Sequence, residues 1–392
     1  MDGSTANFVG GMLRERRRVE RTMSDARRDA GVSVLIPTHA DAHLLRKSIP
    51  TLLEHPHSIE ILVLNNDPSQ DVGAAIGEYA DDARVRIVEM GYEAGFARAI
   101  NRGIRESSFE LVMFCNADLF PTPGYLVEMA AFFERRAKAG AAIGKILRYD
   151  LATDAPNGLI DTAGLLLTRQ RRFIMRGEGE PDAGQFDEEI EVFAVDGAAL
   201  VLRRAALDEV AVDGEYLDEN FVTHKEDHDI SWRVRLAGWE CWYVPSALAY
   251  HGRTTRGLGS TGYLSAVRSF HRNEMQKPLY VQVNALKNQW LMLIKNEDGF
   301  NFVRDFPFIF LREAMITLHN ALFAPKALAA VPQTLKLLPE TLHKRRAAKR
   351  SQLMDPRDLR RWLSGGGGVD VAQSAPEAQP VAAAASETSS GG

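Results

Sequence analysis

Four short apolar runs recur along the first third of the chain, and stretches of helical periodicity separate them. The apolar runs cover residues 32–36, 59–64, 85–88 and 111–114. The intervening stretches are long enough for helices and cover about 44–53, 71–80 and 95–105. Strands that alternate with helices of this length form βαβ units, in which the strands pair in parallel. We therefore predict an α/β fold with a mostly parallel central sheet flanked by helices.

Polar residues follow three of these apolar runs, at the point where each predicted strand ends. They are Pro37-Thr38-His39, Asn65-Asn66-Asp67 and Asn116-Ala117-Asp118. Open α/β sheets bind ligands outside the carboxyl ends of their strands, so we expect the three groups on one rim. The carboxylate of Asp118 beside an amide suits a hard divalent cation and its phosphate ligand. A turn in which Asp118 caps the next helix explains the same tripeptide without a ligand.

An acidic cluster, Glu226-Asp227-His228-Asp229, opens a predicted helix over 226–237, which Gly238 ends. Acidic residues in a first turn are favoured by the helix dipole and by capping, which is a purely structural explanation. The functional explanation is that one carboxylate of Glu226-Asp227 is a general base at the rim of a cleft. Asp229 is better explained by a structural role on the helix.

Two further motifs lie downstream of a predicted strand over 239–244. His251 stands before Gly252, and a lone histidine of this kind is more often structural, so it gains weight as a metal ligand only if Asp118 binds a cation. Residues 257–262 satisfy GxGxxG, but they follow no strand directly and no βαβ unit succeeds them, which disfavours dinucleotide binding. We favour a mobile loop, flanked by Arg253 and Arg256, that closes over a diphosphate.

Composition limits the class of protein. A hydrophobic fraction of 45% and a charged fraction of 25% are ordinary for a soluble globular protein, and a net charge of −5 argues against a nucleic-acid binder. Two cysteines fit a reducing compartment and exclude a disulfide framework. We find no signal peptide and no apolar run that would span a membrane. These features predict a cytoplasmic protein.

The chain divides into four predicted regions. They are a basic, flexible segment over 1–30, a catalytic domain over 31–262, a helical and partly amphipathic region over 263–363, and a disordered tail over 364–392. Within the second region, 192–202 is predicted to be a strand, a turn at Asp196-Gly197 and another strand.

Apolar and basic residues interleave between about 285 and 363. The basic residues include Lys295, His343, Lys344, Arg345, Arg346, Lys349 and Arg350. Amphipathic helices with a basic flank lie on anionic membrane surfaces, and we predict such a peripheral contact. The alternatives are a helical subdomain that packs on the catalytic core, or a dimer contact.

The order and spacing of these motifs resembles the family-2 glycosyltransferases of the GT-A fold, especially their bacterial rhamnosyltransferase-like branch, which builds cell-surface polysaccharides. The likeness runs from about 32 to about 296. It rests on matching segments at 32–38, 95–104, 116–118, 195–204, 226–233 and 237–239, and on His251.

The resemblance implies roles for individual residues. The metal motif of the family, DxD or Asn-Pro-Asp, reads Asn-Ala-Asp here, so only Asp118 is implied as a direct ligand of Mg²⁺ or Mn²⁺, with His251 as a second ligand. Asp227 is implied as the general base, with Glu226 beside it. Further implied contacts to the nucleotide sugar are Pro37, Thr38, Asn65, Gly95, Arg98, Asn101, Asn116 and Ala117.

The function that the resemblance implies is inverting, metal-dependent transfer of a sugar from a nucleoside-diphosphate donor. The favoured donor is dTDP-rhamnose, and the acceptor is a hydroxyl of a glycan or lipid-linked glycan at the inner face of the cell membrane. One alternative is a UDP-sugar transferase, such as a galactofuranosyltransferase, and another is a catalytically degenerate scaffold of the same fold. A sugar-phosphate nucleotidyltransferase needs a Gly-rich, basic loop after the first strand, and Pro37-Thr38-His39-Ala40 is not one.

Overall fold

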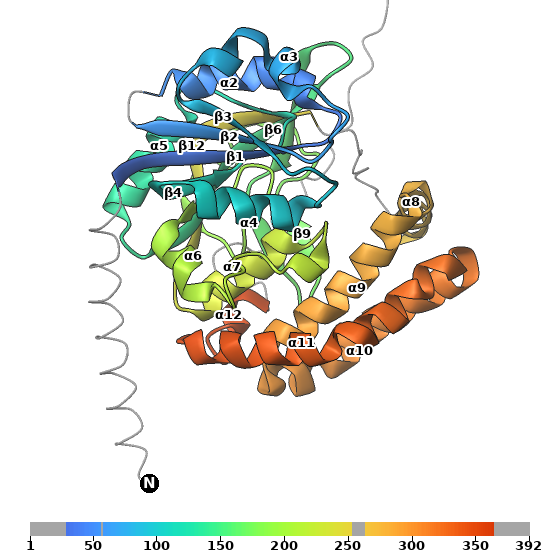
Figure 1. The fold of residues 1–392 in the computed structure, drawn as a ribbon. Coiled ribbons are helices and arrows are strands. Elements are labelled where there is room, and N and C mark those ends of the chain that lie inside the picture. The colour runs from blue at the N-terminus through green and yellow to red at the C-terminus, as the bar shows by residue number, and fades with distance from the viewer. Residues whose placement is uncertain (1–28, 56–57, 253–262, 364–392) are drawn as a thin grey trace, which may run out of the picture.

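The computed structural model describes residues 29–55, 58–252 and 263–363, and in it a mixed sheet lies between layers of helices (Figure 1). The predicted α/β fold with flanking helices is therefore confirmed. The expectations for the N-terminal segment up to residue 28, for the loop at 253–262 and for the tail after 363 lie outside the described residues.

The N-terminal half of the sheet is parallel, as the alternating pattern predicts. Its order is β4-β1-β2-β3, and the strands are β1 (Asp29–Thr38), β2 (Ile59–Asn65), β3 (Val85–Glu89) and β4 (Phe109–Phe114). Thr38 and Asn65 are direct partners in the β1–β2 register. The polar residues at the ends of these two strands are therefore neighbours on one rim.

The other half of the sheet mixes directions. The antiparallel strand β11 (Val201–Arg203) joins β4 to β6 (Ala139–Asp150), and β12 (Glu240–His251) runs parallel to β6. The remaining members are β5 (Leu119–Pro121), β7 (Ala155–Thr162) and β10 (Ile190–Glu191), and a separate hairpin holds β8 (Leu165–Leu167) and β9 (Phe173–Met175).

The strand–turn–strand predicted over 192–202 is correct for the turn near Asp196-Gly197 and for the final strand, where β11 begins, but the first strand is absent. Residues 192–200 belong to no strand. Isolated backbone hydrogen bonds still join them to neighbouring strands, such as that from the Val192 N–H to the Cys241 carbonyl over 2.9 Å. The side chain of Asp196 accepts the Ala198 N–H over 3.0 Å. This local side-chain bond turns the backbone and competes with a continuous ladder.

Helices cover both faces of the sheet (Figure 1). On one side lie α2 (Leu45–Leu53) and α3 (Val72–Ile76), and on the other lie α4 (Phe96–Glu106), α6 (Arg204–Val210) and α7 (Glu226–Leu236). A further helix, α5 (Tyr125–Arg135), packs on β6 and β12. The helix predicted over 71–80 ends early, because Gly77 has a φ of +64° and the chain continues as a 3-10 turn over Gly77–Asp81.

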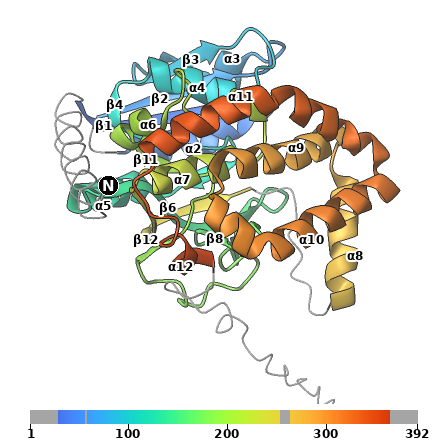
Figure 2. The ribbon, with the colours of Figure 1, turned by 90° about the horizontal axis from the view of Figure 1, so that it is seen from below.

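The C-terminal region is helical, as predicted. It contains α8 (Tyr263–Gln276), α9 (Leu279–Asn296), α10 (Gly299–Phe323), a 3-10 turn (Pro325–Ala329), α11 (Ala330–Ser351) and α12 (Arg360–Leu363). Figure 2 shows α9 and α11 side by side, and α9 also contacts α7. Among the described helices, none is both long and apolar enough to cross a membrane.

Lys295 and Lys344 were predicted to lie at a membrane surface. In the structure they form ion pairs that join α9 and α11 to the catalytic domain. Lys295 and Lys344 are buried, and their ammonium groups lie 2.5 Å and 2.7 Å from the two carboxylate oxygens of Asp218. Burial alone would raise the pKa of Asp218, but the two lysines hold that pKa well below its usual range. The alternative of a helical region packed on the catalytic core therefore accounts for these two residues.

Candidate active site

Asp118 and His251 meet where two strands end. Asp118 follows β4 by a short turn and directly precedes β5, while His251 is the last residue of β12. Because β5 and β12 pair antiparallel, with Leu119 opposite His251, the two side chains are brought together from distant parts of the sequence. Oδ1 of Asp118 lies 3.2 Å from Nε2 of His251.

A third residue, Asp161, which the sequence motifs did not predict, completes this group. Its Oδ2 lies 2.8 Å from Nδ1 of His251, and its carboxylate is fully buried near the end of β7. Burial lowers the pKa of His251, but hydrogen bonds to Asp118 and Asp161 raise it to about 9. In the sequence, Asp161 stands in no motif, and its one signal is an acidic residue directly after the apolar pair Leu159-Ile160.

The acidic pair occupies the first turn of α7, as predicted, and the two carboxylates have different surroundings. Asp227 accepts N–H bonds from His228 at 2.8 Å and from Gly197 at 3.0 Å. Burial raises the pKa of Asp227, and these two donors oppose the rise. Burial raises the pKa of Glu226 to about 8, and within the described part of the chain Oε1 of Glu226 has no hydrogen-bond partner. Asp227 is therefore the member of the pair whose carboxylate is held by backbone N–H donors.

A three-residue turn, Asp196–Ala198, links the two groups. The carbonyl of Ala198 accepts the N–H of Asn116 over 3.0 Å, and the N–H of Gly197 binds Asp227. A Cβ on Gly197 would lie 3.1 Å from Cβ of Asp227, so the glycine permits a close approach. The Asn116–Asp118 motif and the acidic pair are thus held by one short turn. The sequence predicted a turn here but assigned it no role in the site.

Three of the residues implied in nucleotide binding lie at the carboxyl ends of β1 and β2. Pro37 pairs with Leu64 in the register, and Thr38 and Asn65 are buried one position further on. Oγ1 of Thr38 donates to Asp41 over 2.6 Å, and Nδ2 of Asn65 donates to Glu89 over 2.8 Å. These side chains reach the expected rim of the sheet, but their polar groups already have partners within the protein.

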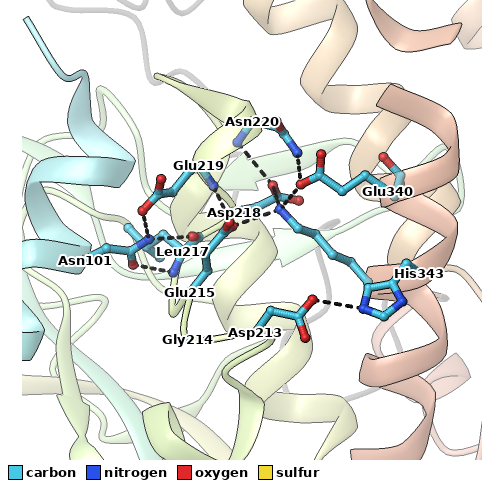
Figure 3. Close-up of polar contacts among 12 residues, drawn as sticks. Asn101, Asp213, Gly214, Glu215, Leu217, Asp218, Glu219, Asn220, Glu340 and His343 are labelled. Carbon is cyan, nitrogen blue, oxygen red and sulfur yellow. Dashed lines mark hydrogen bonds and ion pairs between the residues drawn. The ribbon is translucent and has the colours of Figure 1, made fainter. Parts of the chain in front are cut away.

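Asn101, another residue implied in nucleotide-sugar binding, lies in α4 and faces a loop of the same chain (Figure 3). Nδ2 of Asn101 donates to the Leu217 carbonyl over 2.9 Å and to Glu219 over 3.1 Å, and its Oδ1 accepts the Leu217 N–H over 2.8 Å. Nε of Arg98 lies 3.1 Å from Glu219. Asn101 is fully buried, so it fastens the loop that leads toward α7. Gly95 is the N-cap of α4, with a φ of +80°.

Comparisons with known proteins concern the family and the fold. Residues 33–210 match the model of glycosyl transferase family 2. A poly-beta-1,6-N-acetyl-D-glucosamine synthase of Staphylococcus epidermidis is 24% identical over 226 residues, which cover 56% of this chain and 49% of the relative. The synthase of the same name from Staphylococcus aureus (strain COL) is 23% identical over 225 residues, with the same coverage. The chain thus spans about half the length of the curated relatives it matches.

A solved structure, GalNAc-T7 with UDP, GalNAc and Mn²⁺, superposes with a TM-score of 0.50 at 12% identity, covering 70% of this chain and 49% of that one. At this identity the likeness concerns the fold. Together with the mixed sheet, this likeness shows a GT-A-like fold, and the match to the glycosyl transferase family 2 model covers residues 33–210 of the 392.

Proposed function

We propose that the chain is an inverting glycosyltransferase that moves a sugar from a nucleoside-diphosphate donor to a hydroxyl group of a glycan or lipid-linked glycan. The observation that carries the proposal is the turn at Asp196–Ala198, which holds Asn116 beside the Asp118–His251 pair on one side and Asp227 on the other. Such transfer needs a group that stabilises the departing diphosphate and a group that removes a proton from the acceptor.

On the donor side, Asp118 and His251 would hold Mg²⁺ or Mn²⁺. Asp161 binds Nδ1 of His251, which favours the tautomer whose Nε2 is available as a ligand, an arrangement common around metal-bound histidines. Among the described residues, no group of three or more His, Cys, Asp or Glu side chains could by itself hold a metal ion, so diphosphate oxygens and water would complete the coordination. When bound, the cation supplies Lewis-acid stabilisation of the charge that leaves with the diphosphate.

On the acceptor side, Asp227 would act as the general base. As the acceptor oxygen bonds to the anomeric carbon, the bond from that carbon to the diphosphate oxygen breaks and the hydroxyl proton passes to Asp227. Attack from the face opposite the diphosphate inverts the anomeric centre. The N–H groups of His228 and Gly197 support this role, because they fix the position of the Asp227 carboxylate at the start of α7.

For the donor sugar, the resemblance favours dTDP-rhamnose, with UDP-galactofuranose as the alternative. The relatives named above are N-acetylglucosamine polymer synthases, and the solved neighbour contains UDP and GalNAc. UDP-N-acetylhexosamines are therefore a third candidate class of donor.

A donor panel tests the proposal. Release of nucleoside diphosphate from dTDP-rhamnose, UDP-galactofuranose and UDP-N-acetylglucosamine is measured with Mn²⁺, with Mg²⁺ and with chelator. We expect at least one donor to be consumed in the presence of metal, and Asp118→Ala to abolish the response to metal. Asp154→Ala, which removes an exposed carboxylate after β6, is the matched control. Failure to bind or consume any donor would favour the catalytically degenerate scaffold.

We also propose that the junction of α10 and α11 rests on an anionic membrane, close to a lipid-linked acceptor. Leu318, Leu322 and Leu335 are 60%, 65% and 64% exposed. The sequence from 314 to 339 contains Lys326 and Lys336 but no acidic residue. Apolar side chains with a basic flank are the features that bind a helix to an anionic bilayer surface.

Flotation with vesicles tests this contact. We expect the protein to float with vesicles that contain phosphatidylglycerol, and Leu322→Glu with Leu335→Glu to abolish flotation. Val303→Glu, at the opposite end of α10 and 76% exposed, is the control and should float normally. A protein that does not bind these vesicles, or a double variant that floats like the wild type, would contradict the contact.

A further inference from the structure

The segment that leads into the acceptor carboxylates has an unusual backbone. Val222, His224 and Lys225 have positive φ angles of 64°, 74° and 73°. Val222 combines its φ with a ψ of −60°, and the N–H of Thr223 donates to the Phe221 carbonyl over 2.7 Å. These are the features of the strained form of the γ-turn, and a β-branched residue at positive φ is a clear outlier. Such a conformation persists only where the surroundings hold it.

Asn288 of α9 provides the first hold on this segment. Its side chain is fully buried, and Nδ2 lies 2.9 Å from the Phe221 carbonyl and 2.8 Å from each of the carbonyls of Thr223 and His224. The two N–H groups of one side-chain amide therefore serve three backbone acceptors. The preceding residue, Lys287, donates from Nζ to the carbonyl just upstream of the segment over 2.8 Å.

The N-terminus of α4 provides the second hold. The N–H of Phe96 donates to the Val222 carbonyl over 2.8 Å. A Cβ on Gly95 would lie 2.8 Å from that same carbonyl oxygen, which leaves glycine as the residue that fits. The strained segment is thus held between α9 and α4, the helix that contains residues implied in binding the nucleotide sugar.

We propose that Asn288 is a positioning residue for glycosyl transfer, which holds residues 221–225 and thereby fixes the first turn of α7 and the carboxylate of Asp227. The inference rests on the proposed function. The α7 helix begins at Glu226, directly after the strained segment, so a change in that segment moves the acidic pair. Asn288 contacts the backbone and acts through it. The α9 helix is itself fixed on α7, because Asn296 donates to Asp229 over 2.8 Å.

The test compares Asn288→Ala with Asn301→Ala. Asn301 is an equally buried asparagine in α10 that donates to the Pro356 carbonyl over 2.6 Å, away from the acidic pair. For Asn288→Ala we expect kcat to fall by about 10- to 100-fold, the usual cost of a misplaced catalytic group, with the donor KM unchanged within about twofold. The control should keep its kcat. A normal kcat in Asn288→Ala would overturn the inference.

Two further measurements separate positioning from a general loss of structure. Amide hydrogen exchange at Phe96 and Thr223 should accelerate in Asn288→Ala and stay unchanged in the control. In an Asp227→Asn background, Asn288→Ala should cause little further loss of kcat, because it acts through Asp227. Full additivity or unchanged exchange would contradict positioning.

The exchange measurement also distinguishes this inference from the proposed function, since it needs no substrate. If no donor is consumed by the wild type, the proposed function fails, and exchange alone decides whether Asn288 holds the segment. If Asn288→Ala does not fold, Asn288→Ser keeps one hydroxyl donor on a shorter side chain, which does not serve all three carbonyls, and should show a lowered kcat and faster exchange than the wild type. A wild-type value of either quantity would again overturn the inference.

Discussion

Oδ1 of Asp118 lies 3.2 Å from Nε2 of His251, a contact that joins the end of β4 to the end of β12 through the short strand β5. Neither residue is a convincing ligand by itself. Their approach, with Asp161 behind the imidazole, produces a site that favours positive charge at the rim of the sheet. This is the part of the molecule where the proposed metal and the diphosphate would meet.

Asp161→Asn should weaken metal binding without removing a ligand. The amide that this substitution introduces can still contact Nδ1 of His251, but it lacks the negative charge that fixes the tautomer of the imidazole. Replacing a residue that hydrogen-bonds a metal ligand typically lowers metal affinity by about 10- to 100-fold. We expect a corresponding rise in the Mn²⁺ concentration needed for half-maximal activity. Calorimetric titration with Mn²⁺ provides a readout that is independent of turnover. Equal Mn²⁺ affinities in the variant and the wild type would contradict the assigned role.

Gly197→Ala should damage catalysis more than folding. The new methyl group would lie 3.1 Å from Cβ of Asp227 and would displace that side chain. We expect kcat to fall by about tenfold or more, because small displacements of reacting groups are costly. Gly124→Ala, where no atom lies within 4 Å of the added methyl, is the control. A Gly197→Ala enzyme with wild-type kcat would show that the close approach is irrelevant to turnover.

Glu226→Gln should change how stability depends on pH. The pKa of Glu226 is raised from 4.5 to about 8 in the folded protein, so between these values the folded state binds more protons than the unfolded state. Stability from this group is therefore lost as the pH rises from about 4.5 to about 8. We expect the Tm of the wild type to fall more steeply over this range than that of Glu226→Gln. Glu93→Gln, an exposed control, should follow the wild type, and parallel curves for all three proteins would contradict the raised pKa.

Local pattern was enough to predict the parallel half of the sheet, because β1 to β4 are short apolar runs between helical stretches. It was also enough to place Asp118 and the acidic pair at element boundaries. The contact between Asp118 and His251 depends on the pairing of β5 with β12, which no local pattern encodes, and only the family resemblance joined the two residues.

Other features depend on tertiary contacts that leave no trace in the local sequence. Asp161 belongs to no motif, and its role depends on a partner in another strand. Lys295 and Lys344 follow an amphipathic pattern that equally suits a membrane surface, and only the position of Asp218 decides that they are internal. Positive φ at Val222 runs against the preference of that residue and requires the hold from Asn288.

The measurement that tests the central claim most directly is turnover of Asp227→Asn beside that of Glu226→Gln, together with calorimetric binding of the nucleoside diphosphate to each variant. If Asp227 is the base, Asp227→Asn lowers kcat by about 10²- to 10⁴-fold and leaves nucleotide affinity unchanged. Near-full turnover in Asp227→Asn with loss of turnover in Glu226→Gln would contradict the account and assign the base to Glu226.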